Sequence, residues 1–269
     1  MEIPNVFTTT GTFQIEWYSL IAVGEDNTEA NDQWMTMDGA QIYGFKEPSS
    51  YVYPAGLGLS PEAISSMDGW LKVYRTKNVD KWDWMTRTND GNGHEVYVDI
   101  DEVGLYTLYI SSLSAGQAID KIVLIESSVS DGMEWMARNA LDETACEEYP
   151  TIAPSPSPTT PATTAVPVPA PTMTMAPTNK TTCDCGVPLE DRDAGEFACF
   201  FKTDSQGRAV IEMESVDYSG TDFEFGDATD IYDEGAWSGT GYLINVGPGY
   251  STPGNSVLEI PIVFTTTGT

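Results

Sequence analysis

The stretch DGNGHEVYVDIDEVGLYTLYISSLSAGQAIDKIVLIE, residues 90–126, decides the fold class. It contains three short runs rich in β-branched and aromatic residues, Glu95–Ile100, Leu105–Ser111 and Ile119–Ile125. Such residues favour a pleated strand, whereas the Gly, Asn, Asp and Ser residues between the runs favour tight turns. The stretch therefore predicts three consecutive β-strands.

The same pattern recurs along most of the chain. Short apolar runs separated by Gly, Asn and Asp predict an all-β fold, with two antiparallel sheets packed as a jelly-roll-like sandwich. Only residues 132–146 (GMEWMARNALDETAC) show a helical period over a useful length. The further expected strands are Thr12–Val23, Gln33–Met37, Trp70–Tyr74, Val210–Val216, Tyr242–Val246 and Val257–Phe264.

Residues 150–182 have a different composition, dominated by Pro, Thr, Ser, Ala and Val, with no charged residue before Lys180. Nine of the chain's 17 prolines lie between Pro150 and Pro177, and X-Pro steps exclude helix and remove sheet donors. We expect a polyproline II stalk spanning about 90 to 100 Å; the alternative is a bare flexible linker. Its hydroxyl groups and one N-glycosylation sequon indicate glycans on Ser155, Ser157, Thr159, Thr160, Thr163, Thr164 and Asn179.

The four cysteines flank this tract. Cys146 precedes it, and Cys183, Cys185 and Cys199 follow it. Because neighbours in a C-x-C pair rarely bond to each other, we expect Cys146 and Cys199 each to form a disulfide with Cys183 or Cys185, in either order. Four free thiols and a zinc site are the alternatives. Disulfides would indicate a secreted, extracellular protein.

One segment of sequence occurs twice. EIPNVFTTTGT at residues 2–12 returns as EIPIVFTTTGT at residues 259–269, with Asn5 replaced by Ile262 as the single difference. The two segments begin 257 residues apart, at residues 2 and 259. Near-identical segments at this distance predict a tandem array of which the chain holds slightly more than one period.

The array predicts a division of the chain in which the two ends belong to the same kind of domain. Residues 209–269 would form the first part of a sandwich, which residues equivalent to 13–126, of the same or the next copy, would complete. The intervening sequence would consist of connectors and the stalk. The expected divisions are therefore residues 1–126, a short helical and Cys-containing connector at 127–149, the stalk at 150–182, a second Cys-containing connector at 183–208, and residues 209–269.

The chain is strongly acidic, with 41 Asp and Glu against 12 Lys and Arg and a formal charge of −29. Such a charge repels phosphate backbones and anionic membranes, so nucleic acid is the least favoured partner. No apolar run approaches the length of a membrane span. The acidity suits a soluble extracellular protein, a cation-loaded surface or a saline medium, and calcium is the natural counter-ion to consider.

Four segments resemble one known family. AVIEMESVDY (209–218), GAWSGTGYLINVG (235–247), GTFQIEWYSLIAVGEDNTEANDQW (11–34) and the stretch 90–126 are similar to the galactose-binding-like β-sandwiches of the family 6 and family 35 carbohydrate-binding modules. The resemblance leaves out the stalk and the Cys-containing flanks. It implies the fold more specifically than the ligand, because this sandwich carries lectins, enzyme appendages and structural modules.

The resemblance also implies a metal site. Glu212 and Glu214 are two residues apart in an expected strand, so both side chains are expected on one face. In the families that the chain resembles, such a pair and an Asp of the last strand hold structural calcium, and Asp120 stands at the matching position. The alternative is that both glutamates simply face solvent.

Carbohydrate recognition would require exposed aromatic rings beside polar groups, because a ring stacks on the apolar face of a sugar while amides and carboxylates bind its hydroxyls. The alternative for each tryptophan is burial in the core. The sugar in question could be an external glycan or the protein's own stalk glycans. The candidate residues are Asn31, Asp32, Trp34, Trp82, Trp84 and Trp237.

These features favour a structural protein over an enzyme. The single histidine, His94, lies in an N-G-H turn, and the chain has no G-x-S-x-G motif, zincin helix or nearby Cys–His pair. Our leading hypothesis is a repeat unit of a secreted, glycosylated extracellular filament or surface appendage, with copies of itself and glycans as partners. The alternative is a carbohydrate-binding module repeated in a polysaccharide-degrading or adhesive protein.

Overall fold

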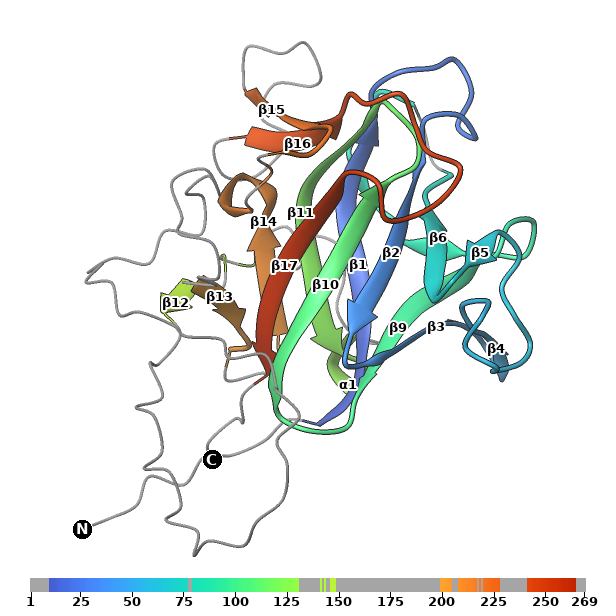
Figure 1. Cartoon of the computed structure of the whole chain (residues 1–269), viewed down its shortest axis with the longest axis vertical. Coiled ribbons are helices and arrows are strands. Elements are labelled where there is room, and N and C mark those ends of the chain that lie inside the picture. The colour runs from blue at the N-terminus through green and yellow to red at the C-terminus, as the bar shows by residue number, and fades with distance from the viewer. Residues whose placement is uncertain are drawn as a thin grey trace, which may run out of the picture.

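A computed structural model describes residues 10–76, 79–130, 141, 143, 146–148, 199–204, 208–216, 218, 220–227 and 241–264. Strands dominate these residues (Figure 1). The strands are β1 (Gly11–Ile21), β2 (Asp32–Asp38), β3 (Gln41–Lys46), β4 (Ser50–Val52), β5 (Ser66–Met67), β6 (Trp70–Tyr74), β7 (Asp83–Trp84), β8 (Arg87–Thr88), β9 (His94–Ile100), β10 (Gly104–Ser112), β11 (Gln117–Glu126), β12 (Cys146–Glu148), β13 (Cys199–Lys202), β14 (Arg208–Glu212), β15 (Phe223–Asp227), β16 (Gly241–Asn245) and β17 (Val257–Phe264). Two short helical turns are described as well, α1 (Ser127–Ser130) and the 3-10 turn η2 (Met213–Ser215).

The strands form two layers joined along one side. One layer has the order β14, β11, β1, β9, β3 and β4. The other has the order β13, β17, β10, β2, β6 and β5. The short β8 pairs with β6 of one layer and with β9 of the other, so that hydrogen bonding runs around a strongly curled, half-barrel sheet.

The expected all-β, antiparallel class is confirmed, with the short parallel contact between β13 and β17 as an exception among the described strands. The two separate sheets expected of a sandwich are joined, because β8 pairs with both layers. The helix expected at residues 132–146 lies largely outside the described residues. No helix in the described part of the chain is long and apolar enough to cross a membrane.

The core lies between the two layers and follows the alternation of the strands. In β10, Tyr106, Leu108 and Ile110 are buried, whereas Leu105 is 39% exposed. In β17, every second residue from Leu258 to Phe264 is buried in the same way. Burying one such side chain contributes about 1.5 to 3 kcal/mol, so the two strands are held by their apolar faces as well as by their ladder. The same core includes Phe13, Ile15, Trp17, Met35, Val96, Val98, Ile122, Leu124, Ile211 and Leu243.

Residues 208–264 complete the sheet that residues 10–126 begin. We call these the C-terminal part and the N-terminal part of the β domain. The strand β14 pairs with β11, and β17 pairs with β10 along its whole length, from Ser111 opposite Val257 to Gly104 opposite Phe264. Figure 1 shows β14 (orange) and β17 (red) beside the green strands β10 and β11. Segments far apart in sequence therefore share one core within this chain.

The strand β11 is buried on both faces, from Gln117 to Ile125. Its inner face contributes to the main core, and on its outer face Val123 and Ile125 pack with Trp84, Val210 and Leu141. Polar residues of this strand are therefore enclosed as well, which matters for Asp120 and Lys121 below.

Candidate metal centre

Three carboxylates from the two parts of the β domain meet at one place. Asp120 lies in β11, Glu212 ends β14, and Glu214 lies in η2. One oxygen of each carboxylate lies within 4.8 Å of those of the other two. Asp120 is fully buried, Glu212 is 6% exposed and Glu214 is half-buried. The fold thus brings together the three residues that the family resemblance implied as calcium ligands, which we call the acidic triad.

The backbone geometry that brings Glu214 beside Glu212 is a turn and not the expected strand. The strand expected at Val210–Val216 is wrong in its second half, because β14 ends at Glu212 and the backbone turns through η2. The N–H of Val216 donates to the carbonyl of Met213 at 3.2 Å, which closes the turn, and the Met213 side chain is fully buried. This turn, and not the alternation of a strand, carries Glu214 to the side of Glu212.

The spacing and chemistry of the triad fit one hard cation. Calcium binds carboxylate oxygens at about 2.3 to 2.6 Å, so two oxygens on the same ion lie at most about 5 Å apart. The three oxygens lie within 4.8 Å of one another, which meets this condition. A set made only of oxygen donors favours calcium or magnesium over zinc. The triad could therefore hold a metal ion.

A buried lysine shares the site. The Lys121 ammonium Nζ lies 2.7 Å from Glu212 Oε1 and donates a hydrogen bond of 3.1 Å to the Leu141 carbonyl. The two charged side chains are 2% and 8% exposed. Lys121 and the three carboxylates of the triad together carry a formal charge of −2. This net negative charge would attract a cation. Sequence analysis did not single out Lys121, although a lysine directly after Asp120 in an apolar run was a visible signal.

A fourth acidic residue lies close by. Desolvation raises the pKa of the Glu143 carboxyl, and repulsion from Glu212 adds to this, while a hydrogen bond with Ser215 and attraction to Lys121 act in the opposite direction. Glu143 comes from the segment that follows the N-terminal part. Sequence analysis missed it because nothing in its surroundings distinguishes it from the chain's other acids.

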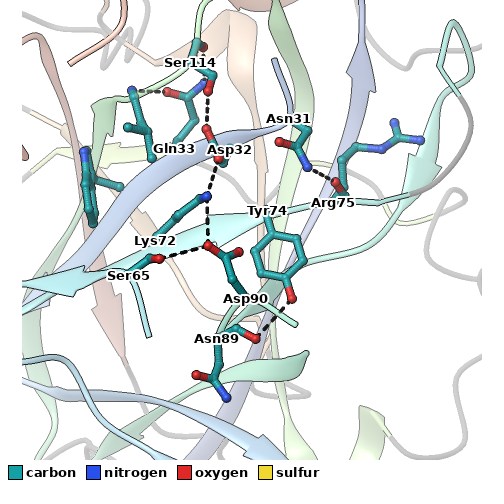
Figure 2. A network of polar contacts seen from close by, with 12 residues as sticks. Asn31, Asp32, Gln33, Ser65, Lys72, Tyr74, Arg75, Asn89, Asp90 and Ser114 are labelled. Carbon is teal, nitrogen blue, oxygen red and sulfur yellow. Dashed lines mark hydrogen bonds and ion pairs between the residues drawn. The ribbon is translucent and has the colours of Figure 1, made fainter. Parts of the chain in front are cut away.

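The first group of sugar-binding candidates is engaged in internal contacts (Figure 2). Lys72 Nζ lies 2.9 Å from Asp32 Oδ2, and the Ser114 hydroxyl donates to the same carboxylate. The Asn31 amide donates to the Arg75 carbonyl. The indole N–H of Trp34 donates to the Tyr250 carbonyl at 3.2 Å. Asn31, Asp32 and Trp34 are 4%, 6% and 4% exposed, so this structure presents no ring face of Trp34 to solvent.

Lys72 connects Asp32 to a second carboxylate, that of Asp90, at 3.0 Å (Figure 2). Desolvation lowers the pKa of the Lys72 ammonium, but its hydrogen bonds and charge attraction to Asp32 and Asp90 outweigh this, and the pKa is raised. The pair of carboxylates thus holds the lysine in its charged form. This arrangement links β2, β6 and the turn after β8, which is the role that the structure gives Asp32.

Trp82 and Trp84 both pack against Tyr18, with ring centroids 5.6 and 5.2 Å from it. Trp82 also packs edge-on against Tyr242 of the C-terminal part at 5.3 Å. The two tryptophans are 7% and 5% exposed. Trp237 lies outside the described residues.

The remaining candidates are only partly described. Cys146 and Cys199 lie in the paired strands β12 and β13, where Cys146 is opposite Phe201 and Cys199 is opposite Glu148. The backbones of these two cysteines are thus on neighbouring strands but not directly opposite. Outside the described residues lie Cys183, Cys185 and the expected glycosylation sites Ser155, Ser157, Thr159, Thr160, Thr163, Thr164 and Asn179.

The single histidine is enclosed. His94 is 1% exposed, its Nε2 lies 2.9 Å from the Ser50 hydroxyl, and its Nδ1 lies 2.6 Å from the Asn92 carbonyl. Both ring nitrogens therefore have partners within the fold, and these contacts fix the turn between β8 and β9.

Comparison of the chain with protein-family models, with curated proteins and with solved structures finds no match in any of the three. What can be said of this chain therefore rests on its own residues and their geometry.

Proposed function

We propose that this chain is a structural repeat unit of a secreted, glycosylated extracellular filament or surface appendage. The observation that carries the proposal is the place of β17. This strand contains residues 259–264, the first six residues of the second copy of the repeated segment, and it lies between β10 and β13 with Leu258, Ile260 and Ile262 fully buried. Every second one of these six residues is thus part of the packed core of the fold.

A periodic array would explain why a segment that is repeated in the sequence also forms a core strand. In an array with a period of 257 residues, the segment at residues 259–264 would also stand directly before the strand equivalent to β1 of the next copy. Phe264 and Phe13 support such a connection, because their ring centroids lie 4.8 Å apart. The three threonines that follow Phe264 would bridge a gap of about 13 Å at most, which is enough to join neighbouring strand ends.

The acidity and the stalk fit the same role. A formal charge of −29 keeps a secreted chain soluble and loads it with cations. A Pro/Thr tract with glycans would act as a semi-rigid spacer between β domains. Calcium at the acidic triad would hold the two parts of each domain together, since Asp120 and the two glutamates come from different parts.

Electron microscopy of the natively secreted protein tests the proposal. We expect long, unbranched particles in which globular domains recur at a uniform spacing, and antibodies against residues 208–264 should decorate them at the same interval. Single globular particles that carry no regular spacing at any protein concentration would contradict a filament repeat.

A further inference from the structure

Aromatic rings cover the outer face of the sheet where β9, β3 and the edge strand β4 lie side by side (Figure 1). On β3 and β9, Ile42 and Val96 face the core. The alternate residues Tyr43 and Tyr97, opposite each other in the ladder, therefore face away from it. The solvated face of an antiparallel sheet is usually polar. Here it carries a group of rings in contact, which we call the aromatic cluster: Tyr43, Phe45, Tyr51, Tyr53 and Tyr97.

The cluster is enclosed at one end and open to solvent at the other. The ring centroid of Tyr43 lies 5.8 Å from that of Tyr51, 6.1 Å from that of Tyr53 and 6.0 Å from that of Tyr97. Rings at such separations pack against each other. Tyr43 and Tyr97 are only 7% and 8% exposed, whereas Tyr51 is 42% exposed. Tyr51 is therefore the ring of the cluster that another molecule can reach most easily.

The two enclosed tyrosines donate hydrogen bonds to carboxylates. The Tyr43 hydroxyl donates to Asp99 Oδ1 at 3.1 Å, and the Tyr97 hydroxyl donates to Glu95 Oε2 at 3.3 Å. A phenol that loses an electron becomes a strong acid, so a carboxylate that already accepts its hydrogen bond can take its proton. Desolvation raises the pKa of Tyr43, which disfavours loss of the proton alone. The surroundings thus favour loss of an electron and a proton together.

We propose that the aromatic cluster is an oxidative cross-linking site, at which Tyr51 of one copy of the chain forms a dityrosine bond with Tyr51 of a second copy. This inference rests on the proposed function, which brings copies together outside the cell, and it adds a covalent bond between them. The oxidant is hydrogen peroxide, used by a peroxidase. Coupling requires two ring carbons to touch, and Tyr51 is the most exposed ring of the cluster.

Each dityrosine bond consumes one molecule of hydrogen peroxide. Two tyrosines each lose one electron and one proton, and the peroxide takes up both electrons and both protons and leaves as two molecules of water. The two phenoxyl radicals then join through the ring carbons next to their hydroxyl groups. The hydrogen on each of these carbons is transferred to the phenol oxygen of the same ring, which restores both phenols.

The enclosed rings pass an oxidation on to Tyr51. When the oxidant removes an electron from Tyr43, Asp99 accepts the proton. An electron from the adjacent Tyr51 ring then refills Tyr43, which regains its proton from Asp99, while the exposed Tyr51 releases its own proton to water. Because Tyr53 and Tyr97 also contact Tyr43, an oxidation that begins at either ring reaches Tyr51 by the same route.

Peroxidase treatment of the purified chain of residues 1–269 tests the proposal. With peroxidase and hydrogen peroxide, we expect a two-chain product that shows dityrosine fluorescence and survives reducing electrophoresis, which excludes disulfides of the native cysteines. Peptide mapping should place Tyr51 on both sides of the bond. Tyr51→Phe should lose most of this product and melt at the same temperature as the wild type.

Tyr218 provides the matched control. It is 37% exposed, close to the value for Tyr51, but among the described residues it has no ring contact. Tyr218→Phe should leave the yield of the two-chain product nearly unchanged. Tyr43→Phe should slow the reaction and leave the bond at Tyr51, because it removes the relay but not the exposed ring.

The cross-linking site is overturned if Tyr51→Phe and Tyr218→Phe lower the yield equally, or if dityrosine forms only within single chains. A rate that Tyr43→Phe leaves unchanged would overturn the relay through the enclosed rings. Native filaments that contain no dityrosine would remove the cross-link and leave the proposed function standing. Cross-linking at Tyr51 in a chain that forms no filaments under any condition would remove the filament and leave the cross-linking site.

Discussion

The Lys121 ammonium Nζ and the Glu212 carboxylate oxygen Oε1 lie 2.7 Å apart, and both side chains are buried. Lys121 belongs to the N-terminal part of the β domain and Glu212 to the C-terminal part, where the two residues are opposite each other on β11 and β14. This ion pair therefore joins the two parts at the edge of the acidic triad. Removing one member of such a pair leaves the other charge buried without compensation.

Replacing Lys121 with Met should destabilise the domain by about 3 to 5 kcal/mol in the absence of added calcium. The loss should shrink when calcium is present, because a bound cation would compensate the charge of Glu212. Urea unfolding with and without calcium measures both effects. Lys81→Met at an exposed position is the control and should change stability by no more than about 0.5 kcal/mol. Equal losses of unfolding free energy in the two variants would show that the buried ion pair stabilises the domain no more than an exposed lysine does.

Calcium should raise the thermal midpoint of the wild-type chain, and a chelator should reverse the rise. A ligand present at 100 times its dissociation constant stabilises the folded state by about 2.7 kcal/mol. Asp120→Asn should abolish this response, because it removes one of three carboxylates, while Asp101→Asn in an exposed turn should keep it. Calorimetry across a calcium titration measures these thermal midpoints. A wild-type midpoint that calcium leaves unchanged would refute the metal site at the acidic triad.

Most of the strands could be predicted because their residues alternate between core and solvent. The expected Leu105–Ser111 and Trp70–Tyr74 differ from β10 and β6 by one residue or less at each end. The strand β3 was missed because Gly44 interrupts its pattern. A Cβ at Gly44 would lie 2.6 Å from a methyl carbon of Thr88 and 2.7 Å from one of Val52, so the glycine marks a close approach and not a turn.

The candidate site was predictable in its residue types but not in its geometry. The pair Glu212 and Glu214 was visible in the sequence, yet the turn that unites them depends on Met213 being buried, which is a property of the packed core. The tryptophan candidates illustrate the same limit. Sequence shows that Trp34 stands beside polar residues, but only the fold shows that these residues bind Lys72, Ser114 and Arg75 instead of facing solvent.

Residues 1–269, produced as a secreted protein, should be heavier than their polypeptide of 29.3 kDa. Glycans on the hydroxyl-rich stalk and on Asn179 would account for the difference. Intact mass spectrometry checks this, and Asn179→Gln should remove the mass of one N-linked glycan while leaving the remainder. A measured mass equal to that of the bare polypeptide would rule out a glycosylated stalk.

Tyr43 should make the domain sensitive to alkaline pH. Desolvation raises the pKa of its phenol well above the ordinary value, and the charge of Asp99, which accepts its hydrogen bond at 3.1 Å, adds to this. Above a pH of about 10 the unfolded chain loses this proton while the folded chain keeps it, so stability falls with rising pH, by up to about 1.4 kcal/mol per pH unit.

Tyr43→Phe should therefore cost about 1 kcal/mol at neutral pH, through the lost hydrogen bond, and become less destabilising relative to the wild type above pH 10. Burial lowers the pKa of Arg75 to about 10, which has the opposite effect on stability, but this contribution is the same in both chains and cancels in the comparison. Unfolding curves at a series of pH values test the prediction. A constant difference between the two chains from pH 7 to pH 11 would contradict it.

The two copies of the repeated segment should be unequal in their effect on stability. Phe264 is 1% exposed, and its ring packs against Phe13 at 4.8 Å and Tyr106 at 5.5 Å. Phe264→Ala should cost about 3 to 5 kcal/mol. Phe7 is its counterpart in residues 2–12, and Phe7→Ala should cost no more than about 0.5 kcal/mol, because β17 already fills the strand position beside β10.

The single difference between the copies explains which one holds that position. Ile262 is fully buried, and an amide from Asn5 in its place would cost about 1 to 3 kcal/mol unless it found a partner. Asn5→Ile should remove this cost and let residues 2–7 compete with β17 for the strand position beside β10. The double variant Asn5→Ile/Phe264→Ala should then recover part of the stability that Phe264→Ala loses. Urea unfolding of the four variants measures the recovery, and equal losses from Phe7→Ala and Phe264→Ala would instead mean that the two segments are buried in separate places.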